Sequence, residues 1–162
     1  MKLIKYKSKS YPQFQAEGFA AQFAFPFARH FCKGKGLDVG CMKKEWAFPE
    51  AFPIDPLFTP EYDALKLPDG EFDYIFSSHM LEHLDDWVAC LDYWKGKIIK
   101  NGWVFLYLPH YSSEYWRPWN NRKHKHVLTN TILEDYFKDR DWKNILSSGV
   151  DLNASFYVTA QR

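Results

Sequence analysis

Two buried strands joined by a helix constrain the fold of this chain more than any other feature of its sequence. FDYIFSS at residues 72–78 and WVFLYLP at residues 103–109 are continuous apolar runs of strand length. The segment between them has apolar residues at helical spacing, namely Leu81, Leu84, Val88, Leu91 and Trp94. Strand, helix and strand in this order predict an α/β fold with a parallel sheet covered by helices.

The last part of the chain predicts a reversal of strand direction. NILSSGV and ASFYVTAQ have the composition of strands, and only a few residues around Asp151, Leu152 and Asn153 separate them. Because a parallel crossover needs a dozen or more residues, these two strands can pair only as an antiparallel hairpin. We therefore expect a mostly parallel sheet with an antiparallel last strand.

The first part of the chain predicts a helix. From Phe14 to Phe31 the sequence predicts a helix, because phenylalanines recur every four positions from Phe19 onward, and Pro26 predicts a kink or break in it. A length of 162 residues with 46% hydrophobic positions suits one domain and is short for two. We expect a single domain at residues 1–162, with an N-terminal helical segment at 1–34 and the sheet core at 35–162.

Charge and composition exclude several classes of function. A formal net charge of +1 gives no general reason to expect a nucleic-acid or membrane partner. The sequence has no apolar run that predicts a signal peptide or a membrane span, so we expect a cytoplasmic protein. Cys32, Cys41 and Cys90 are widely spaced, which fits reduced thiols better than a disulfide framework or a zinc site.

The segment GLDVGC at residues 36–41 predicts a strand that ends in a ligand-binding turn. Its apolar residues run into Asp38, and Gly40 follows where the backbone must turn sharply. The further glycines of a nucleotide-binding loop are absent, and Met42 stands where such a loop would continue. AFPID at residues 51–55 predicts a second short strand that ends at Asp55. Because those glycines are missing, these residues alone leave open whether the turn is a cofactor site.

Three blocks carry a resemblance to a known family: GLDVGC, DALKLPDGEFDYIFSSHMLEHLDD and KNGWVFLYLPH. Over roughly residues 35–110 the chain resembles the S-adenosylmethionine-dependent class I methyltransferases, particularly small type 11-like proteins. The resemblance implies a Rossmann-like three-layer α/β sandwich with a seven-stranded sheet and S-adenosylmethionine as the cofactor. It also implies methyl transfer, for which we expect a small-molecule or glycan-like acceptor. Too few residues separate Asp55 from Asp63 for a helix and a strand, so we expect the fold to be trimmed in the region 42–65.

The resemblance implies a cofactor site along the ends of the strands. Asp38, Gly40 and Cys41 would form the turn beside the methionine part of the cofactor. Asp55 would accept hydrogen bonds from the ribose hydroxyls, a role that suits an ionised carboxylate. The remaining expected cofactor residues lie further along the chain: Asp63 and Ala64 near the adenine, and Ser78 and His79 in the methyl-transfer cleft.

The residues after Pro109 are candidates for the acceptor site. They lie at the carboxyl end of a predicted strand, where open α/β sheets bind ligands. His110 is the candidate catalytic base for a hydroxyl acceptor, because it is titratable near neutral pH. Tyr111, Tyr115 and Trp116 are the candidate substrate contacts, and packing of the loop is the alternative for them.

Two histidine patterns allow a metal site as an alternative. Residues 79–83 match HxxEH, in which two histidines bind zinc and the glutamate activates water. That signature requires a helix, whereas His79 is expected before the first helical turn. His124 and His126 form a weaker HxH pair, in a segment where Thr129 is a candidate helix N-cap. We expect no metal. A scaffold protein with the methyltransferase fold but without turnover is the main alternative function, and an HxxEH hydrolase is a further one.

Overall fold

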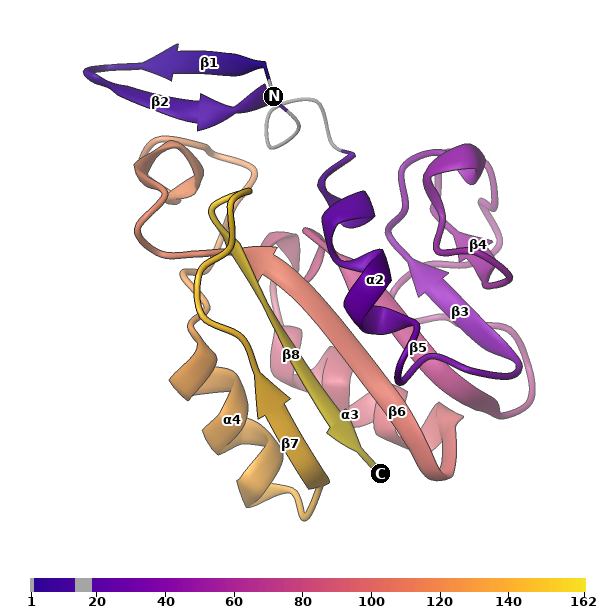
Figure 1. Cartoon of the computed structure of the whole chain (residues 1–162). Helices are drawn as coiled ribbons and strands as arrows, with labels where there is room; N and C mark the ends of the chain where they lie inside the picture. Colours follow the sequence, from indigo (N-terminus) through magenta and orange to yellow (C-terminus); the bar gives the residue numbers. More distant parts are fainter. Residues whose placement is uncertain (1, 14–18) are drawn as a thin grey trace.

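A mixed six-stranded sheet forms the centre of the molecule in the computed structural model, which describes residues 2–13 and 19–162 (Figure 1). The strand order is β4-β3-β5-β6-β8-β7. Neighbours from β4 to β6 pair in parallel, and β8 is antiparallel to both β6 and β7. The strands are β3 (Gly36–Val39), β4 (Phe52–Ile54), β5 (Phe72–Ser78), β6 (Ile98–Pro109), β7 (Lys143–Ser147) and β8 (Ser155–Gln161).

The sheet confirms the predicted topology and corrects the strand count. The predicted hairpin near the end of the chain is β7 and β8, so the last strand is antiparallel as expected. Within the described part of the chain the sheet has six strands, whereas the family resemblance implied seven. The segment between β4 and β5 contains turns and a single bridge between Asp63 and Lys66, because it is too short for a further helix and strand.

Helices cover the two faces of the sheet unequally (Figure 1). One face packs on α3 (Trp87–Lys97) and α4 (Asn130–Asp139) through the larger hydrophobic cluster. The other face is covered by the short helices η1 (Ala20–Phe23) and α2 (Phe25–Ala28). Strand residues alternate between the two clusters, as the two-residue period of a strand requires. The result is a three-layer sandwich with one thin layer.

The thin layer corresponds to the predicted N-terminal helix, but it is shorter. Residues 14–18 of that prediction lie outside the described residues. Pro26 occupies the first turn of α2, where its missing N–H costs no helical hydrogen bond, so the expected break is confirmed as a helix start. Between β3 and β4 only the short helix η2 (Lys44–Trp46) is present, which confirms the trimmed region.

Residues 3–12 form a hairpin, whereas they were expected in a helical segment. β1 (Leu3–Tyr6) pairs antiparallel with β2 (Lys9–Pro12). Ile4 and Tyr6 alternate with lysines, a two-residue period that indicates a strand and that the prediction overlooked. The hairpin is anchored by ring contacts of Tyr6 and Tyr11 with Tyr115, at centroid distances of 5.3 and 6.0 Å.

The helix predicted from Met80 onward begins later, at Trp87. The Asp86 carboxylate accepts a hydrogen bond from the Ala89 N–H at 2.9 Å and is the N-cap of α3. Residues Leu81–His83 form a separate short helix, η3. This irregular segment turns Glu82 and His83 toward the edge of the sheet that carries the candidate site.

Candidate functional site

The carboxyl ends of β3, β4, β5 and β6 lie at one edge of the sheet, because these four strands are parallel. Gly40 follows β3, Asp55 follows β4, His79 follows β5 and His110 follows β6. The predicted cofactor residues of β3 to β5 and the predicted catalytic residue therefore share this edge.

Gly40 forms the predicted sharp turn. Its φ of +87° lies in the left-handed region that favours glycine. The Gly40 N–H donates to the Ile54 carbonyl at 2.8 Å, which joins the turn to β4. Met42 also has positive φ, at 63°, so the loop turns twice in succession without the further glycines of a nucleotide-binding loop. Its neighbour Cys41 is buried, and burial raises the pKa of the Cys41 thiol to about 12, which makes it an inert side chain at neutral pH.

Asp55 connects the loop after β3 with the loop after β4. One carboxylate oxygen accepts from the Met42 N–H at 2.9 Å, and the other accepts from the Leu57 N–H at 3.0 Å. The Asp55 backbone N–H bonds to the Thr59 hydroxyl at 3.0 Å. Each carboxylate oxygen keeps a further lone pair. Asp55 is half-buried, so it is able both to hold the loop and to accept hydrogen bonds from a ligand.

Asp38 has a buried carboxylate, and only one of its two oxygens accepts a hydrogen bond. Its Oδ2 accepts from the Phe48 N–H at 2.6 Å, whereas Oδ1 is buried without a hydrogen-bond partner. The pKa of Asp38 is raised to about 7, mainly by burial; the Phe48 hydrogen bond opposes this rise and the charge of Asp55 adds to it. A cationic group of a ligand would stabilise the ionised form of this carboxylate.

The other predicted cofactor residues have structural partners of their own. Asp63 is exposed, and its carboxylate accepts from the Leu65 N–H at 2.7 Å within a tight turn. The Ala64 carbonyl accepts from the Trp94 indole N–H at 2.8 Å, which ties this turn to α3. Ser78 is the last residue of β5 and is half-buried. His79 has φ of 50° and its Nε2 lies 3.0 Å from the Ser155 hydroxyl.

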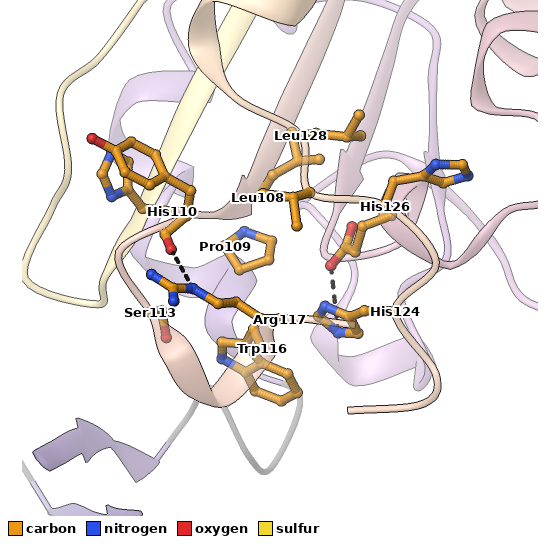
Figure 2. A pocket seen from close by; sticks show the side chains of 12 residues that line it. Leu108, Pro109, His110, Ser113, Trp116, Arg117, His124, His126 and Leu128 are labelled. Carbon is orange, nitrogen blue, oxygen red and sulfur yellow. Dashed lines mark hydrogen bonds and ion pairs between the residues drawn. The ribbon is translucent and has the colours of Figure 1, made fainter. Parts of the chain in front are cut away.

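A pocket that is partly open to solvent lies beyond the end of β6 (Figure 2). Its lining comes from the end of β6, from the loop that follows and from the segment before α4. Glu82 contributes from η3. The lining residues are Glu82, Leu108, Pro109, His110, Tyr111, Ser113, Trp116, Arg117, His124, His126, Val127 and Leu128.

Three of the four predicted catalytic and substrate residues line this pocket. His110 bonds through Nδ1 to the Ser112 hydroxyl at 2.8 Å, and partial burial lowers the pKa of its imidazole. Tyr111 is exposed, and its backbone carbonyl accepts from the Arg117 guanidinium at 3.1 Å. Trp116 stacks on His124 at 4.9 Å. Tyr115 is not among the lining residues and instead packs against the N-terminal hairpin.

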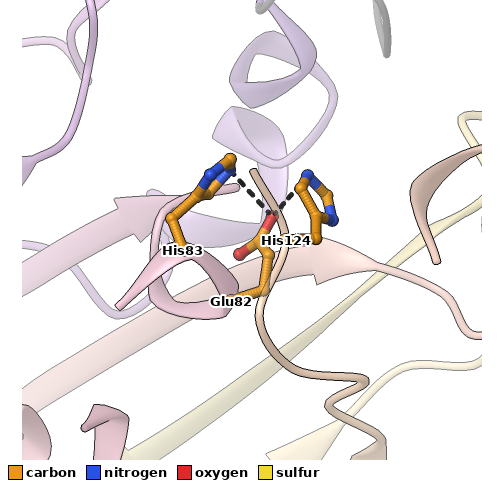
Figure 3. A group of neighbouring side chains, drawn as sticks. All are labelled: Glu82, His83 and His124. Carbon is orange, nitrogen blue, oxygen red and sulfur yellow. Dashed lines mark ion pairs between the residues drawn. The ribbon is translucent and has the colours of Figure 1, made fainter. Parts of the chain in front are cut away.

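Glu82, His83 and His124 form a cluster that the sequence patterns did not assemble (Figure 3). Their possible ligand atoms all lie within 4.8 Å of one another. Of the predicted HxxEH pattern, His83 and Glu82 belong to the cluster. His126 does not, because its Nε2 bonds to the Leu84 carbonyl at 2.9 Å, so the HxH pair does not converge on one point. Both histidine patterns, at residues 79–83 and 124–126, are visible in the sequence. Nothing in the sequence indicates that they lie together in the fold.

Burial dominates the electrostatics around this cluster. It raises the pKa of Glu82 to about 8 and lowers those of His124 and His79 to about 4 and about 3. The repulsion between neighbouring imidazoles lowers the histidine pKa values further. The imidazoles of His79 and His124 are therefore neutral at pH 7, which is the form that binds metal ions, whereas the carboxyl group of Glu82 holds its proton and has to release it when a metal ion binds.

Among the described residues, no helix is both long and apolar enough to cross a membrane.

Comparison with known proteins places the fold in a family. A family model described as a methyltransferase domain matches residues 17–147. A search of curated protein sequences finds no match. Among solved structures, the chain is similar to an S-adenosylmethionine-dependent methyltransferase from Archaeoglobus fulgidus, with a TM-score of 0.63 and 15% identity over 91% of this chain and 94% of that one.

Two further structures show the same likeness. The N-methyltransferase NodS from Bradyrhizobium japonicum, in complex with S-adenosyl-L-homocysteine, aligns with a TM-score of 0.60 and 14% identity over 94% of this chain and 88% of that one. A methyltransferase from Thermotoga maritima aligns with a TM-score of 0.66 and 12% identity over 91% and 92%. The family match covers most of the chain, and the predicted resemblance is confirmed: this chain belongs to the methyltransferase domain family and has the class I fold.

Proposed function

We propose that this chain is an enzyme that binds S-adenosylmethionine at the ends of β3, β4 and β5 and transfers its methyl group to an acceptor in the pocket beyond β6. The observation that carries the proposal is the Gly40 turn, which lies beside the half-buried carboxylate of Asp55 at the same edge as the pocket. The family match and the class I fold support it.

The described residues fit this cofactor in three respects. Asp38 has a buried oxygen without a partner, which suits interaction with the cationic methionine end. The Gly40 turn allows a ligand to approach the backbone closely. Asp55, and next to it the turn at Asp63 and Ala64, offer acceptors for ribose hydroxyls and for the adenine amino group. Cys41, Ser78 and His79 complete the proposed cofactor-binding edge.

The chemistry requires positioning more than covalent catalysis. S-adenosylmethionine supplies a methyl group that is already activated by the sulfonium. The chain has to hold the acceptor in line with that group and keep the pair aligned, which lowers the entropic part of the barrier. His110 is the proposed base where the acceptor is a hydroxyl, since its neutral imidazole lines the pocket.

The pocket suits a small-molecule or glycan-like acceptor. Aromatic and polar residues line it together, a combination that is typical of sites for small ligands. Tyr111 and Trp116 are the proposed acceptor contacts, whereas Tyr115 acts through its packing on the hairpin. We further propose that residues 1–162 act as one domain.

Isothermal titration calorimetry with S-adenosylmethionine and S-adenosyl-L-homocysteine tests this function directly. We expect binding of one molecule per chain in each case. Binding without methyl transfer to any acceptor in a screen of small alcohols, amines and sugars would favour the scaffold alternative. No heat of binding for either compound, with protein whose fold is confirmed by circular dichroism, would contradict the proposal.

A further inference from the structure

Glu82 is a fully buried carboxylate for which the described structure provides no hydrogen bond. Both carboxylate oxygens lack a hydrogen-bond partner, and the residue is 1% exposed. By contrast, the backbone carbonyl of Glu82 accepts a hydrogen bond from the Lys125 N–H at 2.8 Å. Burial of an ionised carboxylate without partners is strongly unfavourable, so such a group either keeps its proton or pairs with a cation or a metal ion.

The nearest polar side chains around this carboxylate are imidazoles. His83 Nε2 lies 3.8 Å and His124 Nε2 lies 3.9 Å from Glu82 Oε1 (Figure 3). His79 Nδ1 lies 4.0 Å from the same oxygen. Two donors that bind one ion at about 2.1 Å lie at most about 4.2 Å apart. The Glu82–His83 and Glu82–His124 separations fit this limit, and the possible ligand atoms of all three residues lie within 4.8 Å of one another.

Ring contacts restrain the imidazole of His124. It stacks on the Trp116 ring at a centroid distance of 4.9 Å and an interplanar angle of 9°. The His83 ring meets it edge-on at a centroid distance of 4.5 Å. Such contacts limit the orientations that the two imidazoles adopt.

The cluster opens onto the pocket described above. Glu82 and His124 line it together with His110 and Trp116 (Figure 2). An ion bound by three protein side chains at the wall of a pocket retains coordination positions that face the pocket. Three protein ligands with an open position are typical of catalytic metal sites, whereas structural sites are closed by four.

We propose that Glu82, His83 and His124 bind a divalent first-row transition metal ion, and that the open positions of this ion bind an oxygen of the methyl acceptor. Two imidazoles and one carboxylate suit Zn²⁺, Mn²⁺ or Fe²⁺ better than Mg²⁺ or Ca²⁺, which prefer oxygen ligands. The set differs from the HxxEH hydrolase pattern, because Glu82 is a ligand and the second histidine comes from a distant segment. The proposed metal binding does not depend on the proposed methyl transfer, whereas the proposed acceptor class does.

The proposed acceptor is a hydroxyl compound. A hydroxyl bound to a metal ion loses its proton more readily, and His110, the proposed base in the same pocket, would accept that proton. One electron pair of the resulting oxygen anion forms the C–O bond to the methyl carbon. The C–S bond breaks, its electron pair stays on sulfur, and S-adenosyl-L-homocysteine leaves as the neutral thioether. No oxidant or reductant is needed.

Metal stoichiometry after incubation with ZnCl₂ and dialysis tests the site. We expect about one Zn²⁺ ion per parent chain, and affinities lower by at least about tenfold in Glu82→Gln and His124→Asn. His126→Asn is the matched control, because it removes an imidazole from the same segment and its amide is still able to donate to the Leu84 carbonyl. Absence of Zn²⁺ from the parent, or full retention by both ligand variants, would overturn the proposal.

A second measurement needs no variant, in case the substitutions prevent folding. A metal that binds only the folded chain raises its melting temperature with metal concentration. We expect the parent to melt at higher temperature in ZnCl₂ than in EDTA. Loading with Co²⁺ should also give visible absorption bands typical of nitrogen and oxygen ligands. A melting temperature that is the same in both solutions would contradict metal binding.

Two further titrations separate this inference from the proposed function. If the chain binds S-adenosyl-L-homocysteine but takes up no metal, the proposed methyl transfer stands and the proposed metal site is refuted. If it takes up metal but does not bind the cofactor, the metal site stands and the proposed methyl transfer is refuted. For the acceptor class, catechol should change the Co²⁺ spectrum of the parent and aniline should not. An unchanged spectrum with catechol would exclude the hydroxyl acceptor while leaving the ion in place.

Discussion

The Met80 side chain packs directly against the backbone of Gly40. A Cβ atom at position 40 would lie 2.7 Å from the Met80 Cβ, closer than real side chains approach. The same residue has φ of +87°, so two independent constraints require glycine here. Met80 follows β5 and Gly40 follows β3, so the contact joins the two strand ends between which we propose the cofactor binds.

Gly40→Ala should weaken S-adenosyl-L-homocysteine binding at least about tenfold, because the turn must move to relieve the clash and the left-handed strain of about 1–2 kcal/mol. Met42→Leu is the matched control, since it keeps a side chain of similar size on a residue that already has positive φ. Calorimetry on both variants measures the difference. Equal affinity of folded Gly40→Ala and the parent would show that the turn plays no part in binding.

Asp55→Ala should lower both cofactor affinity and stability. The carboxylate accepts two backbone N–H groups, from Met42 and Leu57, so its loss costs about 1–3 kcal/mol of unfolding free energy as well as the proposed ribose contacts. Urea denaturation and calorimetry measure the two effects separately. Asp139→Ala, which removes an exposed carboxylate from α4, should change neither. Lower stability with unchanged affinity would restrict Asp55 to holding the loops.

Asp38 predicts a pH dependence of stability. Burial raises its pKa to about 7 in the folded chain, from an ordinary value of 3.8. The folded state therefore holds this proton more tightly, so the stability it contributes is complete below about 3.8 and is lost as pH rises through about 7. The unfolding free energy of the parent should fall relative to Asp38→Asn by at most about 1.4 kcal/mol per pH unit between these values. Parallel stability curves for the two proteins would refute the shift.

Thr129 is the N-cap of α4, as its sequence context predicted. Its hydroxyl accepts from the Ile132 N–H at 3.3 Å, and its backbone is extended. Thr129→Ala should cost about 1 kcal/mol of unfolding free energy, whereas Thr129→Ser should keep most of it because the hydroxyl remains. Thermal and urea denaturation measure both. A loss of the same size in the serine variant would point to packing of the methyl group instead of the cap.

The predictions that held depended on local patterns with few alternatives. The strand at residues 72–78 was predicted with the observed bounds, because a buried strand needs a continuous apolar run. The hairpin of β7 and β8 followed from the short connection between them. The helix start was misplaced because Leu81 and Leu84 keep a helical spacing, yet the chain turns through η3 and is capped only at Asp86.

The candidate site was predictable where it consists of strand ends and not where it consists of loops. The ends of parallel strands meet at one edge, so Gly40, Asp55 and His110 could be placed there from the order of the strands alone. Tyr115 was assigned to substrate because it follows β6, but it packs on a hairpin near the other end of the sequence. A contact of that kind has no local signal.

The sequence by itself determined the mostly parallel sheet, its antiparallel last strand and the family, because these depend on hydrophobic period, connection length and short motifs. The tertiary structure alone decided that Glu82 and His83 meet His124. These residues come from two segments on different sides of β6 in the sequence, and they meet only because η3 and the segment before α4 fold over the same strand end. Burial excludes water from the Glu82 carboxyl group, beside which the two imidazoles lie. Two histidine patterns that are separate in the sequence therefore form one candidate metal site.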